Sequence, residues 1–427
     1  MWMPLLFGAL VLSSANIPAR ASDWQETLSD AIRIATSANP ELSGMDAEIR
    51  AWRERARQAD SLPDPNLSMG AVNVPTNLSF AEDPMTMKEV SLSQTLLPAG
   101  MRAASRLAAL AGAEAIEREH MHHVDEVAAR TARAFFDIAA LDERLAIAKE
   151  TRGLLDDDSR AAEERYRVGR GAQADLLRAS LEKLRVTREI AGMEGERRAS
   201  AADFNALLAR PADADVPPIA GIHPDESVPE RARFLARALS ESPALRHDDA
   251  GIERAAQEAR RARLERRPVW SLSAMYGERA HRDDMVSATV GLSLPFFHPA
   301  RLSARAAEAD AMLEAARAER ASAENRLRGE VEAALARLAS DVRQARLYRD
   351  SILPEAEMNS RAAREAYSVG TIDFATLVAA SVDLATFRSE YADRLASIGR
   401  DRADLQVAAG VPLLPGTPGM EHEHESP

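Results

Sequence analysis

Residues 164–180 read "ERYRVGRGAQADLLRAS", and residues 365–381 read "EAYSVGTIDFATLVAAS". In both stretches a tyrosine stands two residues before Val-Gly, and Ala-Ser closes the stretch; the tyrosines, Tyr166 and Tyr367, lie 201 positions apart. A similar offset relates "SANPEL" at 37–42 to "SESPAL" at 240–245. The chain is therefore a tandem duplication of a unit far longer than a solenoid repeat.

The composition favours long helices over a globular α/β core. Aromatic residues make up only 4% of the 427 residues, charged residues make up 28%, and cysteine is absent. The absence of cysteine excludes disulfide bonds and thiolate chemistry. A net charge of −13 argues against nucleic acid as a partner.

The N-terminus has the pattern of a secretory signal. An apolar run from Leu5 to Leu12 leads to Ala19-Arg20-Ala21, which predicts a signal peptide over residues 1–21 of an exported protein. The alternative is a short buried helix. No later stretch reaches the ~18–20 apolar residues of a membrane helix. We expect repeat 1 at 22–210, a linker at 211–230, repeat 2 at 231–411 and a flexible acidic, histidine-bearing tail at 412–427.

Each repeat contains two predicted strands. In repeat 2 the apolar residues Trp270, Leu272, Ala274 and Tyr276 alternate with small residues, chiefly serine. A period of two residues is typical of a strand with one apolar face. The predicted strands cover about 66–74 and 87–97 in repeat 1, and about 269–276 and 286–295 in repeat 2.

A long helix follows each strand pair. In repeat 1 it extends over about 99–166, with Phe135, Ile138 and Leu141 on one seam. Steps of three and four residues predict coiled-coil packing, and about 68 residues give a rod of about 100 Å. The Val-Gly turn ends this helix and a second helix returns. The fold class is mainly α, with long coiled-coil helices and four antiparallel strands per chain.

Four strands are too few for a barrel with an interior. An open sheet in lipid leaves unpaired edges, so several copies must combine. Two, three or four copies give eight, twelve or sixteen strands, and the larger numbers enclose a lumen. Three copies of a duplicated chain give sixfold pseudo-symmetry and a 12-stranded trimeric β-barrel.

With these features the chain resembles the TolC-like outer-membrane efflux channel family. The resemblance covers essentially all of the mature chain and depends on "SANPEL"/"SESPAL", the element order and the two Val-Gly stretches. It implies a homotrimer in the outer-membrane lipid of a Gram-negative bacterium, with a long periplasmic helical tunnel. "LPDPNLSMGAVNVP" at 62–75 and "SLSQTLLPAG" at 91–100 are similar to the heavy-metal efflux subclass, although drugs and peptides remain open as cargo.

The resemblance implies a passive exit duct of a tripartite efflux system, without a cofactor. An inner-membrane pump of the proton-driven RND type feeds the duct, and a periplasmic adaptor (membrane fusion protein) opens its tip. The hairpin tips then form the gate and the adaptor-docking surface. The tip residues are Tyr166, Val168, Gly169, Arg170, Tyr367, Val369, Gly370 and Thr371.

Two carboxylates near the tips are candidates for an acidic entrance. Asp175 lies six residues after Gly169, where family members carry entrance acids. Repeat 2 has Thr376 at the equivalent position, and Asp373 substitutes for the missing acid. A ring of carboxylates favours cations. The alternative is a solvated carboxylate that stabilises a helix N-terminus.

Gly153 and Pro354 both lie 16 residues before the tip glycine of their repeat. They weaken a helix by about 1 and about 3 kcal/mol, and 16 residues correspond to about 24 Å. We hypothesise that they are hinges about which the entrance opens. A static bend is the alternative.

A histidine-rich stretch, "EHMHHVDE" at 119–126, is a candidate metal contact. His120 and His123 are one helical turn apart, and imidazole with the Met121 thioether suits soft ions. The alternative is a solvated or inter-helix role. The tail contains "EHEHES", which is either a weak cation binder or a disordered polar segment.

An enzyme is not supported. The sequence contains no Gly-x-Ser-x-Gly, no His-Glu-x-x-His and no phosphate loop. The alternative to a channel is a secreted helical scaffold or a periplasmic adaptor without channel activity.

Overall fold

The computed structural model describes residues 24–169, 171–294 and 299–410. The first half contains α1 (Trp24–Ala38), α2 (Pro40–Ala59), β1 (Asn66–Val72), β2 (Met87–Leu96), α3 (Met101–Arg167) and α4 (Gln173–Leu207). The second contains α5 (Arg231–Glu241), α6 (Pro243–Leu264), β3 (Val269–Glu278), β4 (Met285–Ser293), α7 (Pro299–Leu347), the π-helical turn η2 (Tyr348–Ile352), α8 (Leu353–Val369) and α9 (Phe374–Ala409). The expected signal peptide, Arg170 and the tail at 412–427 lie outside the described residues.

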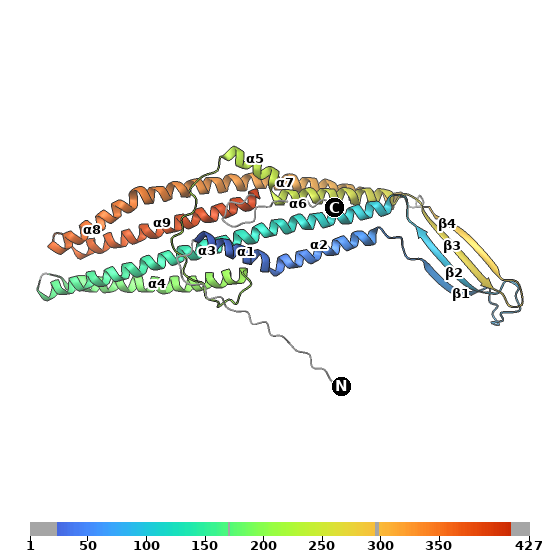
Figure 1. The fold of residues 1–427 in the computed structure, drawn as a ribbon, viewed down its shortest axis with the longest axis horizontal. Coiled ribbons are helices and arrows are strands. Elements are labelled where there is room, and N and C mark those ends of the chain that lie inside the picture. The colour runs from blue at the N-terminus through green and yellow to red at the C-terminus, as the bar shows by residue number, and fades with distance from the viewer. Residues whose placement is uncertain (1–23, 170, 295–298, 411–427) are drawn as a thin grey trace, which may run out of the picture.

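Shorter helices flank the long ones in both halves. Figure 1 shows α2 and α4 placed end to end along α3, and α6 and α9 placed end to end beside α7 and α8. Where the end of α9 meets the start of α6, Gly410 adopts a left-handed backbone (φ 63°), and a Cβ there would lie 2.8 Å from Pro243 Cδ. Only glycine fits so close an approach. Within the described ranges, no helix combines the length and apolar character needed to cross a membrane.

The two repeats begin their second helix differently. In repeat 1 the Asn39 side chain accepts a hydrogen bond of 2.8 Å from the Glu41 backbone N–H, immediately before Pro40. This is the capping arrangement that asparagine and proline favour. In repeat 2 the equivalent Ser242 makes no side-chain cap bond, and its buried hydroxyl has no partner among the described residues.

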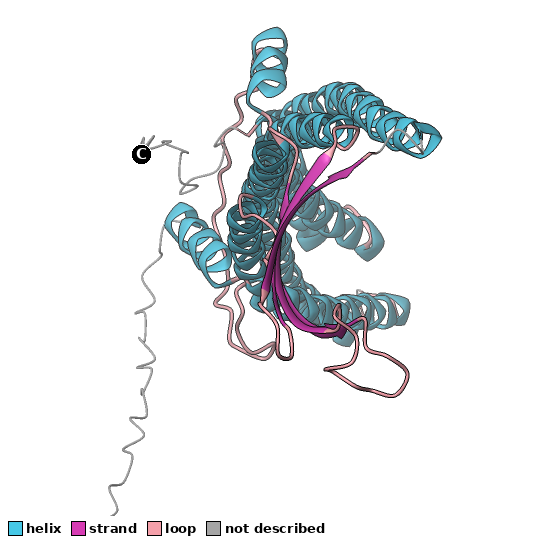
Figure 2. Ribbon diagram, turned by 90° about the vertical axis from the view of Figure 1, so that its right-hand side faces the viewer, coloured by secondary structure: helices cyan, strands magenta, loops and turns pink. Residues whose placement is uncertain are grey.

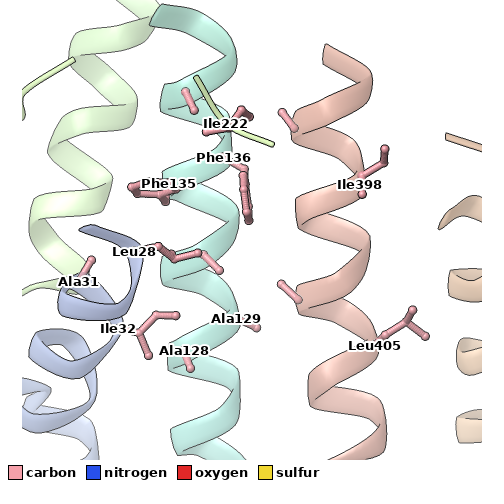
Figure 3. Packing of buried hydrophobic residues seen from close by; sticks show 14 of the residues in the cluster. Leu28, Ala31, Ile32, Ala128, Ala129, Phe135, Phe136, Ile222, Ile398 and Leu405 are labelled. Carbon is pink, nitrogen blue, oxygen red and sulfur yellow. The ribbon is translucent and has the colours of Figure 1, made fainter. Parts of the chain in front are cut away.

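The main core lies where α1, α3 and α9 meet. Phe135 and Phe136 are fully buried and pack edge-on at 5.7 Å between ring centroids. Figure 3 shows Leu28 and Ile32 of α1 against these residues of α3, with α9 on the other side. The seam expected from the helical spacing is confirmed, since Phe135, Ile138 and Leu141 are all buried.

The four strands form one antiparallel sheet in the order β1-β2-β3-β4. Met69 pairs with Val90, Leu92 with Ala274, and Ala274 with Ala288. Figure 2 shows that the sheet is curved and continues the curvature of the helical layer. In the described residues the outer edges of β1 and β4 have no partner strand.

The strand ends differ from the expected ends by one or two residues. β1 ends at Val72 instead of 74 because Asn73 adopts a left-handed backbone (φ 53°). Its carbonyl accepts a 2.7 Å hydrogen bond from the Thr86 hydroxyl, which closes the loop. β3 continues to Glu278 because this residue still pairs with Lys88 of β2.

The segment 211–230 links the repeats, and we call it the strap. Val216, Ile219 and Ile222 anchor it in the core. Asp142 of α3 accepts a 2.9 Å hydrogen bond from the Ile219 N–H and also pairs with Arg197. Figure 2 shows the strap crossing the convex side of the helical layer.

Candidate functional site

The two hairpin turns lie at the same end of the molecule, opposite the sheet (Figure 1). Gly169 and Gly370 both adopt the left-handed backbone, with φ of 72° and 81°. Each glycine N–H bonds to the carbonyl of the tyrosine three residues earlier at 3.0 Å. A side chain at either position would be strained, so the sequence places glycine where the chain reverses.

The two tips present different surfaces. Val168 and Val369 are exposed at 66% and 75%, so each turn carries an uncovered apolar residue. Tyr166 is also exposed, but Tyr367 is buried and packs edge-on against Phe374 at 5.6 Å. The repeat therefore predicts both turns, but not the burial of one tyrosine.

Arg165 joins the two tips and was not expected from the sequence. Its guanidinium donates to the main-chain carbonyl of Tyr367 and lies 4.7 Å above that residue's ring. A Cβ on Gly370 would come within 3.1 Å of the same guanidinium. Repeat 2 has alanine, Ala366, at the position equivalent to Arg165, and this asymmetry is the only signal the sequence offered.

Asp175 and Asp373 occupy different environments. Asp373 caps α9: its side chain accepts from the Thr376 N–H at 2.9 Å and hydroxyl at 2.6 Å. These hydrogen bonds from Thr376 lower the pKa of Asp373 below its ordinary value. Asp175 lies in the first turn of α4. Burial raises the pKa of Tyr367, Arg165 opposes the shift, and the charge of Asp175 adds to it.

The two expected hinge residues also differ. α3 continues unbroken through Gly153, and a Cβ there would meet nothing within 4 Å. Pro354 is the second residue of α8, which begins directly after η2. Proline removes a backbone donor and clashes with the preceding turn, and π-helical turns absorb such mismatches. Only repeat 2 interrupts its long helix in this way.

The histidines of the stretch 119–126 contact different carboxylates and do not converge on one point. His120 Nε2 lies 3.6 Å from Asp46, whereas His123 lies 3.3 Å from Glu126 and 4.0 Å from Glu119. The Met121 sulfur is 4.0 Å from the guanidinium of Arg118. Across the described ranges, no group of three or more His, Asp or Glu side chains is arranged to hold a metal ion.

One face of the sheet is apolar and open to its surroundings. The exposed apolar residues are Leu67, Met69, Val90, Leu92, Trp270, Leu272, Tyr276, Val286, Val290 and Leu292. The opposite face carries small polar groups, and the Ser68 and Ser91 hydroxyls are 2.7 Å apart there. An exposed apolar band opposite a polar face is typical of strands that contact lipid on one side and water on the other.

A curved sheet with a lipid-compatible face, continued by long antiparallel helices, defines a subunit of an outer-membrane channel protein. The sequence profile described as "Outer membrane efflux protein" matches residues 31–210 and 234–411, and the chain belongs to this family. The resemblance to outer-membrane efflux channels is thereby confirmed, as is the mainly α fold with a small sheet.

Individual relatives agree with this assignment. The chain is 23% identical over 386 residues to "Outer membrane efflux protein BepC" of Brucella suis biovar 1, covering 83% of this chain and 81% of that protein. Its fold matches the outer membrane protein VceC of Vibrio cholerae with a TM-score of 0.77 at 17% identity, covering 91% and 98% of the two chains. The Campylobacter jejuni CmeC outer membrane channel matches with a TM-score of 0.75 at 14% identity, over 99% and 95%.

Proposed function

We propose that three copies of the chain form a passive exit duct across the outer membrane. The observation that carries this proposal is the pair of unpaired edges, β1 and β4, on a sheet whose apolar face is exposed. An edge strand cannot face lipid because its N–H and C=O groups stay unsatisfied. β4 of one copy pairs with β1 of the next, and three copies give twelve strands around an open lumen.

A soluble scaffold fits the same sheet poorly. Met69 and Val286 are exposed at 74% and 79%, and they belong to a continuous apolar band across four strands. A soluble protein rarely leaves a band of that kind open to water. Lipid would cover this apolar band. The exposed face is therefore consistent with membership of an outer-membrane protein family.

The hairpin tips are the docking surface for a periplasmic adaptor. The exposed Val168 and Val369 support this role, because six such valines in a trimer offer apolar contacts to a partner's helical hairpin. The other described tip residues shape the turns and the gate; they are Tyr166, Gly169, Tyr367, Gly370 and Thr371. The energy comes from an inner-membrane pump of the proton-driven type.

Cations are the cargo class that the tip favours, and heavy-metal ions are among them. Three copies of Asp175 around one axis attract cations and repel anions. Asp373 contributes less, because its carboxylate already accepts two hydrogen bonds from Thr376. His120, Met121 and His123 are then transient contacts along the tunnel, each beside its own partner. Deleting the gene and measuring resistance to copper, zinc and cationic drugs identifies the cargo.

The channel proposal is tested with the full-length protein extracted in detergent. We expect a heat-stable trimer with threefold projections in electron micrographs and stepwise conductance in planar lipid bilayers. A soluble monomer without conductance would overturn the proposal. Co-purification from native membranes tests the adaptor and the pump, and their absence would remove the tripartite assignment but not the channel.

A further inference from the structure

The strap is bonded directly to the only π-helical turn in the described residues. The Glu226 carboxylate accepts a 2.6 Å hydrogen bond from Arg349 Nη1, inside η2, and a 3.1 Å bond from Arg346 Nε, two residues before η2 begins. Arg346 Nη2 also donates to the Glu226 carbonyl at 3.2 Å. The Glu226 side chain is only 21% exposed. Charge-assisted bonds of this kind are the stronger ones in proteins.

The strap is itself fixed beside Glu226. Arg402 of α9 donates to the carbonyls of Asp225 and Ser227, each at 3.0 Å, and to the Asp225 carboxylate at 2.7 Å. The Arg402 side chain is 11% exposed. Burial alone would raise the pKa of Asp225, but hydrogen bonds from Ser227 and the charge of Arg402 outweigh it and lower the pKa. Glu226 is therefore held on a stationary support.

Tyr348, the first residue of the π-turn, is held by α9. The Tyr348 hydroxyl donates a 2.8 Å hydrogen bond to Glu390. A π-turn contains one residue more than the α-helix accommodates, so its register persists only where side chains outside the helix fix it. Here the fixing groups outside η2 include Glu390 of α9 and Glu226 of the strap, and within η2 Arg349 also pairs with Asp350 at 2.9 Å.

We propose that Glu226 is a tether by which the strap sets the bend between α7 and α8, and hence the position of the second hairpin tip. The inference rests on the proposed channel function and names a regulation of that same tip. α8 is 17 residues long, so it forms a lever of about 25 Å. A change of about 10° at η2 moves the tip by roughly 4 Å over that lever. A partner that pulls on the convex side of the strap therefore acts on the gate through Glu226.

The test compares Glu226→Gln with Glu332→Gln in the full-length trimer. Glu332 forms a similar charged pair with Arg231, at 2.7 Å, which connects α5 to α7 without touching η2. The native chain has no cysteine, so Val369→Cys gives one spin label per subunit at the second tip. We expect Glu226→Gln to lengthen or broaden the label–label distances and to raise the mean single-channel conductance at least about twofold. Glu332→Gln is expected to change neither.

Arg349→Gln provides a second variant that removes the same bond from the other side. It should shift the distances in the same direction as Glu226→Gln, and the double variant should add little to Glu226→Gln, because the Glu226–Arg349 bond is already lost there. Wild-type distances in both single variants would overturn the tether, as would an equal effect of Glu332→Gln. If the label–label distances change in Glu226→Gln but neither the wild type nor any variant conducts ions, the channel proposal fails and the tether stands.

Discussion

At the scale of single residues, Arg165 holds the second tip to the first. It donates to the Tyr367 carbonyl and covers the Tyr367 ring. We predict that Arg165→Ala lowers the free energy of local unfolding of the second tip by about 1–2 kcal/mol. This is the sum expected for one such hydrogen bond and one cation–π contact. Amide hydrogen exchange over residues 367–374 should then become roughly tenfold faster. Arg167→Ala is the control, because within the described part of the chain Arg167 pairs only with Glu163 and Glu164 of its own helix. Equal protection in both variants would contradict the prediction.

Asp125 is half-buried, and its covered Oδ2 has no hydrogen-bond partner among the described residues. Burial raises its pKa to about 7. A carboxyl whose pKa is raised in the folded state destabilises the fold above that pKa, and the penalty disappears as the pH falls from about 7 to about 4. We predict that Asp125→Asn stabilises the protein by about 1–3 kcal/mol at pH 8 and has little effect at pH 4.

Thermal unfolding of the detergent-solubilised protein at pH 8 and at pH 4 measures this effect. Asp64→Asn is the control, since Asp64 is exposed in the segment before β1. A lower midpoint for Asp125→Asn at pH 8 would show that the Asp125 carboxylate is stabilising there.

At the scale of elements, the interruption of the second long helix distinguishes the repeats. Pro354→Ala restores a backbone donor beside η2, so we expect it to shift the distances between spin labels at the second tip. Gly153→Ala should leave the tips in place and stabilise α3 by about 1 kcal/mol, because its new methyl group meets open space. Neither change should alter trimer assembly. Tips that move only with Gly153→Ala would contradict the expectation that the interruption at η2 sets the position of the second tip.

The two faces of β3 make a second prediction at this scale. Leu272 lies on the exposed apolar face and Ser273 lies on the opposite face. In a barrel, Leu272→Lys places a charge in lipid, at a cost of about 2–4 kcal/mol near the midplane, whereas Ser273→Lys faces the lumen. The yield of heat-resistant trimer in outer membranes should fall for Leu272→Lys alone. Equal yields would show that this face does not contact lipid.

The sequence predicted elements with a strong period and missed features that depend on distant partners. The alternation of Trp270, Leu272 and Tyr276 identified β3, and the Val-Gly pairs identified both hairpin turns. The burial of Tyr367 and the role of Arg165 could not be predicted, because both depend on a contact between residues about 200 positions apart. η2 was missed for the same reason: Pro354 marks a disturbance, but the Glu226 bond that accompanies it comes from the strap.

At the scale of the whole molecule, the outer face of α4 is uncovered. Leu177, Leu181 and Leu184 follow one another at helical spacing and are exposed at 61%, 58% and 64%. In the proposed ring we expect this stripe to meet α8 of the next copy, where Met358 is exposed at 53%. We predict that Leu181→Asp lowers the dissociation temperature of the trimer, because it places a charge in an apolar contact. An unchanged dissociation temperature would disprove the proposed contact.

The unpaired outer strands β1 and β4 also bear on how the protein is made. A newly exported subunit exposes the unpaired backbone N–H and C=O groups of two edge strands, together with an apolar surface. Both features promote aggregation with other chains. Such a subunit gains its final stability only from its neighbours, so its folding depends on its own concentration. When the protein is overproduced in the periplasm, we therefore expect it to be either assembled into closed rings or aggregated, with few monomers.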